Sequence, residues 1–227
     1  MKKNLRNIII FLFYLISIPF WRSLFLTKPL LRVWCLHEIK DNQVEAFEKK
    51  LAYLKKHFNL ITPEQFSGGE FIKDRVNFLV TFDDGYDSWL KNALPILDKH
   101  NVKAIFFLEK GFEDKAGVIR QAGHALGGHS VSHSRLTELN SEELKKEVNG
   151  SVKSPFFAYP FGDRQSFNEE VIKEVKEAGY SYAFTILPGF NYKKTNPRLM
   201  HRDSLDPDVS DLIFRLWLKG SYDLIKR

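Results

Sequence analysis

The stretch Phe78-Leu-Val-Thr-Phe-Asp-Asp-Gly-Tyr86 determines how the rest of the chain is interpreted. Its first residues are apolar, β-branched or aromatic and carry no charge, which is typical of a strand buried on both faces of a parallel sheet. The run ends at two adjacent carboxylates, Asp83 and Asp84, followed by glycine. Neighbouring carboxylates repel each other when both are ionised, so they require a cation, a proton or solvent. The stretch therefore predicts either a solvated turn or a site at the end of a buried strand.

A second stretch, Leu126-Gly-Gly-His-Ser-Val-Ser-His-Ser134, places His129 and His133 four residues apart. Both imidazoles would share one face of a helix, or lie within reach of one ion in a loop. A pair with this spacing is weak support for a metal site when it stands alone. Together with a carboxylate from another strand end, however, it forms the three-ligand set of a catalytic metal site that keeps one position open for water. The combination favours a site over a turn.

Three segments in this order resemble the polysaccharide deacetylase (NodB-homology) family of carbohydrate esterases: Thr81-Phe-Asp-Asp-Gly85, Gly128-His-Ser-Val-Ser-His133 and Phe157-Ala-Tyr-Pro-Phe-Gly162. The similarity extends over roughly residues 33–204, with the motifs in family order and at family spacing. The resemblance implies a metal-dependent hydrolase built on a distorted (β/α) barrel of about seven strands.

The resemblance also implies a role for each motif residue. Asp83 would be the general base, and one divalent ion would be held by Asp84, His129 and His133. Such a ligand set suits zinc, and also cobalt or nickel. The motif around residues 159–162 implies that Tyr159 and Phe161 lie at the oxyanion and substrate positions, with a backbone N–H of the turn as the oxyanion donor.

His37 ends a short β-type run over residues 33–39. A lone histidine there is usually a core or surface residue. In this chain it resembles the general acid of the family branch that acts on poly-N-acetylglucosamine, in which the last motif has moved to the front by circular permutation. No histidine follows His201, so the usual late Leu-His motif is absent. We predict His37 as the general acid, with His201 as its competitor.

Arg202 is the predicted partner of the base. Much of the family has an arginine where Ala158 stands in this chain, and that arginine orients the base. The Phe-Ala-Tyr-Pro variant is typical of the permuted branch. Arginine is always charged and can hold a carboxylate through two hydrogen bonds, so Arg202 is the candidate substitute.

Composition indicates one domain and excludes some classes of function. The chain has 227 residues, of which 44% are hydrophobic, enough for one sizeable core. A net charge of +6 suits a membrane surface or an anionic polymer as well as nucleic acid, but no nucleic-acid motif accompanies it. We therefore expect no nucleic-acid partner. The single Cys35 excludes an intrachain disulfide framework and a cysteine-rich zinc site. Oligomeric state is not predicted.

The first 28 residues have the charged start and apolar run of a secretion signal, but no small-residue cleavage site follows. We predict an uncleaved membrane anchor over residues 1–28, followed by a catalytic domain over residues 29–227. A helix lying in the membrane interface and an amphipathic buried start are the alternatives. The catalytic domain is expected outside the cytoplasm, although positive charges flank the apolar run on both sides and leave the orientation unspecified.

Strand and helix patterns alternate along the chain. Helices are predicted over residues 42–58, 88–100 and 168–178, with another opening at residues 140–143, and strands over residues 103–108, 156–159 and 181–186. The aromatic, apolar and basic stretch over residues 212–220 predicts either a terminal helix packed on the barrel or a second membrane contact. A turn is predicted at Gly127 and Gly128, and an irregular stretch over residues 187–208. The alternation predicts an α/β fold, a distorted (β/α) barrel of about seven parallel strands preceded by a membrane-anchor helix, with its site at the carboxyl ends of the strands.

The predicted function is metal-dependent removal of the N-acetyl group from an N-acetylated amino sugar in a polysaccharide or glycan. One alternative is a deformylase or deacetylase of a lipid-linked sugar, which membrane attachment would suit. Another is a glycan-binding barrel without catalysis. The intact set of Asp83, Asp84, His129 and His133 argues against this last alternative, because binding alone would not require all four.

Overall fold

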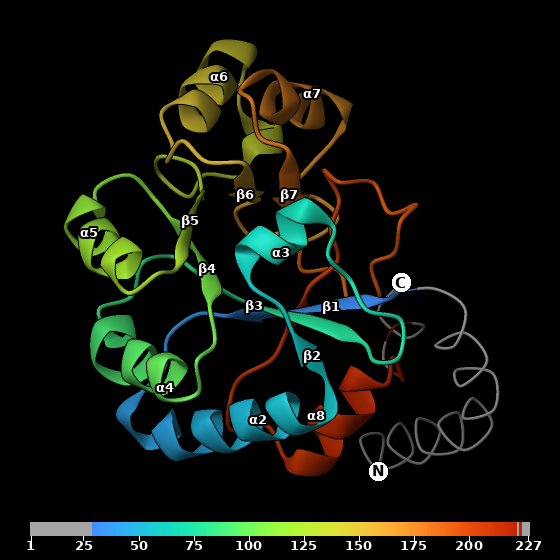
Figure 1. The fold of residues 1–227 in the computed structure, drawn as a ribbon. Helices are drawn as coiled ribbons and strands as arrows, with labels where there is room; N and C mark the ends of the chain where they lie inside the picture. The colour runs from blue at the N-terminus through green and yellow to red at the C-terminus, as the bar shows by residue number, and fades with distance from the viewer. Residues whose placement is uncertain (1–28, 222, 224–227) are drawn as a thin grey trace, which may run out of the picture.

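A curved parallel sheet forms the centre of the protein (Figure 1). The structure is a computed structural model that describes residues 29–221 and Asp223. Neighbouring strands follow the order β7-β6-β5-β4-β3-β1-β8, with β2 also paired to β3, and every pairing is parallel. The strands are β1 Leu31–Leu36, β2 Asn59–Leu60, β3 Asn77–Asp83, β4 Ala104–Leu108, β5 Ala125–Gly128, β6 Phe156–Ala158, β7 Tyr182–Phe184 and β8 Asp203–Ser204.

Helices connect the strands, and most of them surround the sheet (Figure 1). The longer ones are α2 Val44–His57, α5 Glu113–Gln121, α6 Ser141–Asn149, α7 Glu169–Glu177 and α8 Asp211–Leu218, and the short ones are η1 Asp41–Gln43, α3 Pro63–Gly68, η2 Trp89–Ala93, α4 Leu94–Lys99 and η3 Leu136–Glu138. This alternation of strands and helices confirms the predicted parallel α/β architecture.

The two faces of the strands pack into different cores, because successive side chains of a strand point to opposite sides. On β3, Leu79 joins an inner cluster that also contains residues of β1, β4, β6 and β7. Phe78, Val80 and Phe82 join an outer cluster with residues of α2, α4, α5 and α8. Phe66 of α3 packs into the inner cluster against Phe156 and Phe184. Polar residues at inner positions beyond these apolar layers therefore face into the carboxyl end of the curved sheet.

The segment 197–204 lies between the two ends of the sheet. On one side Ala183 donates to the carbonyl of Pro197, and Thr185 donates to that of Met200. On the other side Ser204 of β8 pairs with Cys35 of β1. The predicted irregular stretch over residues 187–208 thus contains a short strand. A two-residue strand carries too little periodicity to be found from sequence.

A buried ion-pair cluster fastens β8 and the chain beyond it to β1. The Arg32 guanidinium donates two hydrogen bonds to Asp203, both 2.7 Å, and two to Asp223, at 2.9 and 3.1 Å. Trp217 of α8 also donates its indole N–H to Asp203. Arg32 and Asp203 are almost completely buried, so these contacts compensate charges that would otherwise be costly in the core.

Gly127 and Gly128 end the strand β5, and the prediction of a turn there is wrong. A side chain at either position would collide with its neighbours. A Cβ on Gly127 would lie 2.3 Å from the Phe107 ring, and one on Gly128 would lie 2.7 Å from the hydroxyls of Ser151 and Tyr180. The glycines are needed for close packing between strands and their surroundings rather than for chain reversal.

The remaining helix predictions are confirmed with changed boundaries. The helix predicted over residues 88–100 consists of the π-helical turn η2 followed by α4, with Pro95 in the first turn of α4, where its missing N–H is tolerated. Asn140 caps α6 and forms a capping box with Glu143. Phe214 and Trp217 of α8 pack into the outer cluster, so the terminal helix lies against the barrel.

The predicted membrane anchor over residues 1–28 lies outside the described residues. Within residues 29–221, none of the helices combines the length and the apolar character that a membrane span requires.

Candidate metal and catalytic site

The polar residues predicted for catalysis meet at the carboxyl ends of the central strands. Asp83 is the last residue of β3, and His37 and His129 directly follow β1 and β5. Asp83 and His129 are buried, whereas His37 is half-buried. In a parallel sheet these strand ends share one edge, which is why residues far apart in sequence come together.

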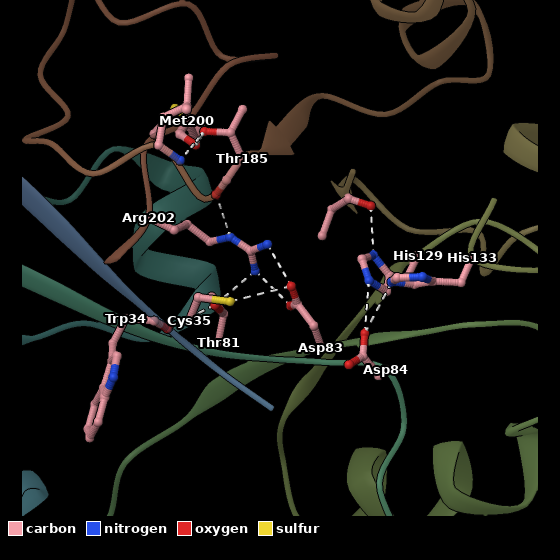
Figure 2. A network of polar contacts seen from close by, with 12 residues as sticks. Trp34, Cys35, Thr81, Asp83, Asp84, His129, His133, Thr185, Met200 and Arg202 are labelled. Atoms are coloured by element: carbon pink, nitrogen blue, oxygen red, sulfur yellow. Dashed lines mark hydrogen bonds and ion pairs between the residues drawn. The ribbon is translucent and has the colours of Figure 1, made fainter. Parts of the chain in front are cut away.

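Asp84 and the two histidines form one group of potential metal ligands (Figure 2). The Asp84 Oδ1 atom lies 3.2 Å from His129 Nε2 and 3.5 Å from His133 Nε2. One ligand atom from each of the three side chains lies within 4.8 Å of the other two. Two imidazole nitrogens and a carboxylate oxygen at this spacing fit a single divalent ion such as zinc, and leave a position for water.

A further hydrogen bond prepares His129 for this role. Its Nδ1 lies 2.8 Å from the carbonyl oxygen of Ala158, to which it donates (Figure 2). This contact fixes the tautomer with Nε2 unprotonated and directed toward Asp84, the arrangement that metal-bound histidines require. The residues therefore fit a bound metal ion in donor type, spacing and tautomer.

Electrostatics in this group favour an ionised Asp84. Burial acts to raise the pKa of the Asp84 carboxyl, but the neighbouring imidazoles of His129 and His133 outweigh it and hold that pKa far below its usual range. The Asp84 carboxylate in turn raises the pKa of His133. A carboxylate that stays ionised is available to bind a cation across the physiological pH range.

Asp83 is held separately from Asp84 by a buried arginine (Figure 2). Arg202 donates from Nη1 to Asp83 Oδ1 at 2.7 Å and from Nη2 to Asp83 Oδ2 at 2.6 Å. It also donates from Nε to the carbonyl of Thr185 and from Nη1 to the Thr81 hydroxyl. Burial acts to raise the pKa of Asp83, but Arg202 and His129 keep it below its ordinary value. The contact predicted between Arg202 and the carboxylate is therefore present.

Sequence reasoning missed two neighbours of this site, Cys35 and Glu109. The buried Cys35 thiol lies 3.4 Å from Asp83 Oδ2, and with Asp83 and His37 it forms a second group of potential ligand atoms within 4.8 Å. Arg202 already occupies both oxygens of Asp83, so the Asp84 group is the better ion site. Burial raises the pKa of Cys35 and keeps it a neutral donor.

Glu109 follows β4, and burial raises its pKa while His133 and His129 oppose that shift. Both missed residues could have been found from strand alternation. Cys35 is two residues before His37, and Glu109 directly follows a predicted strand.

Backbone strain is concentrated around the site. Four residues other than glycine have positive φ there, namely Asp84 at 86°, Ser130 at 64°, His133 at 56° and Phe161 at 63°. Such conformations cost free energy in residues with a side chain and persist only where the surrounding structure enforces them. At Asp84 the positive φ interrupts the strand alternation, so two adjacent aspartates reach different partners.

Phe161 lies against the metal group, whereas Tyr159 does not. The Phe161 ring centroid is 4.8 Å from that of His133, and the residue is 47% exposed. No acceptor for the Phe161 backbone N–H is found among residues 29–221 and Asp223. The Arg135 guanidinium lies over the Phe161 ring and forms two hydrogen bonds with Asp163.

Tyr159, in contrast to its prediction as a substrate residue, belongs to the core. Its side chain is fully buried against Phe157 and Phe167, and its hydroxyl donates to the carbonyl of Arg198. Its backbone N–H donates to the carbonyl of Phe184. The strand alternation explains the difference, because Tyr159 points to the side of β6 opposite Ala158.

The two candidate acids occupy different environments. His37 belongs to the ligand group that contains Asp83, and its backbone carbonyl is fixed by the Trp89 indole N–H at 2.7 Å. His201 lies against Gly189, with its Nδ1 3.2 Å from the carbonyl oxygen of Leu187. Only His37 of these two shares a group with Asp83.

The chain is similar in sequence to known polysaccharide deacetylases. A family model described as polysaccharide deacetylase matches residues 73–183. The peptidoglycan-N-acetylmuramic acid deacetylase PdaA of Bacillus subtilis is 30% identical over 139 residues, which cover 56% of this chain and 52% of PdaA. The chain spans about half the length of the curated relatives it matches.

Two solved structures share the fold. The Streptococcus pyogenes deacetylase PplD, in complex with acetate, superposes with a TM-score of 0.70 at 16% identity, covering 88% of this chain and 98% of PplD. IcaB from Ammonifex degensii superposes with a TM-score of 0.66 at 21% identity, covering 85% of this chain and 96% of IcaB.

Proposed function

We propose that the chain, of which residues 73–183 match the family model described as polysaccharide deacetylase, is a metal-dependent hydrolase that removes the N-acetyl group from an N-acetylated amino sugar of a glycan. The observation that carries the proposal is that two adjacent aspartates have different partners. Asp84 faces two histidines with metal-ligand spacing, and Asp83 is held by a buried arginine. A carbohydrate-binding barrel would not require both arrangements.

Asp84, His129 and His133 would hold the ion, for which zinc is the expected metal and cobalt or nickel would be accepted. When bound, a divalent ion lowers the pKa of a water ligand and polarises an amide carbonyl. The fixed tautomer of His129 and the ionised state of Asp84 both support this assignment.

Asp83 is the proposed general base. The Arg202 guanidinium keeps the carboxylate ionised and fixes the direction of both oxygens, so the carboxylate is ready to accept a proton from the attacking water. The Arg202 side chain is fully buried, and its contacts with Thr185 and Thr81 leave it little freedom to move away. Arg202 thus acts on the reaction through Asp83.

His37 is the proposed general acid, which protonates the leaving amine. It lies next to Asp83 at the end of β1, and its ring is half-buried rather than sealed in the core. The Phe161 backbone N–H, which has no acceptor within the part of the chain that the structure describes, is proposed to donate to the oxyanion that forms on the amide oxygen. A general acid at the first strand of the sheet is the arrangement of the permuted branch, to which we assign the chain.

The glycan is proposed to lie outside the cytoplasm, with the catalytic domain attached to a membrane through residues 1–28. The apolar run without a cleavage site supports attachment, and the PdaA relative is named for action on peptidoglycan. An N-acetylated polysaccharide is the favoured substrate class, since the relatives carry names of peptidoglycan and polysaccharide deacetylases.

An amine-release assay tests the function. Purified protein is incubated with N-acetylglucosamine oligomers, peptidoglycan fragments and polyprenyl-linked N-acetylated sugars, with and without chelator. We expect release from a glycan that stops with chelator and returns with zinc. Asp83→Asn should abolish release and keep the ion, whereas His129→Ala with His133→Ala should lose both. Asp98→Asn, a change to an exposed carboxylate, should have no effect. Undiminished release with chelator, or wild-type rates in Asp83→Asn, would refute the mechanism.

A further inference from the structure

The loop that carries the two metal-ligating histidines has a conformation that it would not adopt alone. Residues 129–133 contain two positive φ angles outside glycine, at Ser130 and His133. Within the loop, the His133 backbone N–H donates to the Ser130 hydroxyl at 3.0 Å. One internal hydrogen bond cannot offset two strained residues, so the support must come from another element.

That support comes from Glu147 on α6. Its Oε2 atom accepts hydrogen bonds from the backbone N–H groups of Val131 and Ser132, both at 2.9 Å. Its Oε1 atom accepts from the Ser132 hydroxyl at 2.7 Å. Hydrogen bonds to an ionised carboxylate are among the stronger ones in proteins. A single side chain therefore binds the middle of the loop through both of its oxygens.

The Glu147 carboxylate is not part of an ion pair in the described part of the chain. Among the ion pairs of residues 29–221 and Asp223, none includes Glu147. A neighbouring residue of α6 behaves differently, since Glu142 pairs with Lys146 on the exposed face of the helix. The half-buried Glu147 thus differs from an ordinary solvated helix glutamate, because every side-chain hydrogen bond that it forms with the described residues goes to the histidine loop.

The helix itself is fixed in place, so it can serve as a support. Its amino terminus is capped by Asn140, and its Leu144 and Val148 side chains are buried in a core cluster with Phe157. Its end lies directly against the loop, because a Cβ on Gly150 would come within 2.6 Å of the Val131 side chain. The loop is therefore held against a rigid element.

We propose that Glu147 is a positioning residue that holds residues 129–133 in the conformation in which both imidazoles face Asp84. The proposal rests on the metal site of the proposed function. Residues that orient metal ligands typically contribute 10–100-fold to metal affinity. Glu147 acts on the ion only through the loop, so its loss should lower metal affinity without changing which atoms bind the ion.

Metal affinity is the test. The dissociation constant for Co²⁺ is measured on metal-free full-length protein by competition with a chromophoric chelator, for wild type, Glu147→Ala, Glu147→Gln and Glu142→Ala. We expect Glu147→Ala to bind Co²⁺ about 10–100-fold more weakly. Glu147→Gln should stay within a few-fold of wild type, because its amide oxygen can still accept from both backbone N–H groups. Glu142→Ala should match wild type.

Two further readouts separate positioning from general damage. At saturating Co²⁺ the visible absorption of Glu147→Ala should equal that of wild type, since the ligands are unchanged. Metal-free Glu147→Ala should retain the far-ultraviolet circular dichroism of the wild type. Wild-type affinity in Glu147→Ala, or an equal loss in Glu142→Ala, would overturn the proposal while leaving the metal site intact. A wild-type protein that binds no Co²⁺ would instead overturn the metal site and the proposed function with it.

Discussion

The buried pair between Arg202 and Asp83 offers the sharpest test of the site. Replacing Arg202 by methionine keeps an unbranched side chain about as long as the aliphatic part of arginine and removes the charged guanidinium. Two hydrogen bonds to an ionised carboxylate are lost, at 2.7 and 2.6 Å, and Asp83 is left only 2% exposed without its cation. Removing one partner of a buried ion pair costs about 3–5 kcal/mol, because the remaining charge is uncompensated. We expect a loss of this size in the free energy of unfolding of Arg202→Met.

A double-mutant cycle isolates the pair from other effects of the substitution. Urea unfolding at pH 7 is measured for wild type, Arg202→Met, Asp83→Asn and the double variant. The free energy of unfolding should fall less in the double variant than the sum of the two single losses, with a coupling of about 2–3 kcal/mol. A second cycle on Lys91 and Asp41, an ion pair exposed to solvent, should show a much smaller coupling because water screens it.

The pH dependence of this coupling has a defined sign. Arg202 helps to hold the pKa of Asp83 below its ordinary value of 3.8 in the folded protein. A carboxyl whose folded pKa is lowered adds stability above its unfolded pKa and loses that contribution as the pH falls below it. The coupling should therefore be complete at pH 7 and decline only in acid. A coupling no larger than that of the exposed pair would refute the assignment of Arg202 as the partner of the base.

Three other predictions follow from the same structure. His37→Ala should retain its metal and lose at least about a hundredfold in turnover, because the general acid is lost. His201→Ala should keep a turnover within a few-fold of wild type. The reverse result in the amine-release assay would assign the acid role to His201. Deletion of residues 1–26 should move the protein from the membrane to the soluble fraction with its metal content intact, and a soluble full-length protein would contradict the anchor. Burial lowers the pKa of His124 from 6.5 to about 4, so neutral His124 stabilises the fold above pH 6.5, and that contribution is lost as the pH falls toward 4. In His124→Asn the side-chain oxygen can accept the Ala104 N–H in place of Nδ1. Between pH 7.5 and 5.5 this variant should lose about 1 kcal/mol less stability than wild type, and equal losses would show that His124 does not titrate as described.

The sequence was sufficient to predict the residues that meet at the strand ends. Asp83 ends a long apolar run, and His37 ends a β-type run, so both could be placed on one edge of a parallel sheet. The contact between Arg202 and Asp83 was also predicted, although residues 119 positions apart in sequence were involved. These predictions succeeded because they used the chemistry of the residues and the direction of parallel strands, which do not depend on exact boundaries.

Side-chain direction near element ends was harder to predict. Tyr159 was placed in the site because it lies in a motif, but it is one residue out of phase with the inner face of β6. The glycines 127 and 128 resembled a turn because their tight packing against Phe107 and Tyr180 depends on distant elements. The short strand β8 has no periodicity of its own and forms only between β1 and its neighbours. Such features come from tertiary packing, which local sequence does not record.

Arg202 and Asp203 are neighbours in the chain that serve opposite faces of the sheet. Arg202 holds Asp83 in the interior, whereas Asp203 binds Arg32 on the other side, together with Asp223. This arrangement restricts how the protein can evolve. Substitutions can accumulate in the loop before these residues, but inserting or deleting one residue beside them would turn the arginine outward and direct the Asp203 carboxylate toward Asp83. Two carboxylates would then face each other without the guanidinium, so a change of length at this point would disable the base and release the end of the chain in a single step.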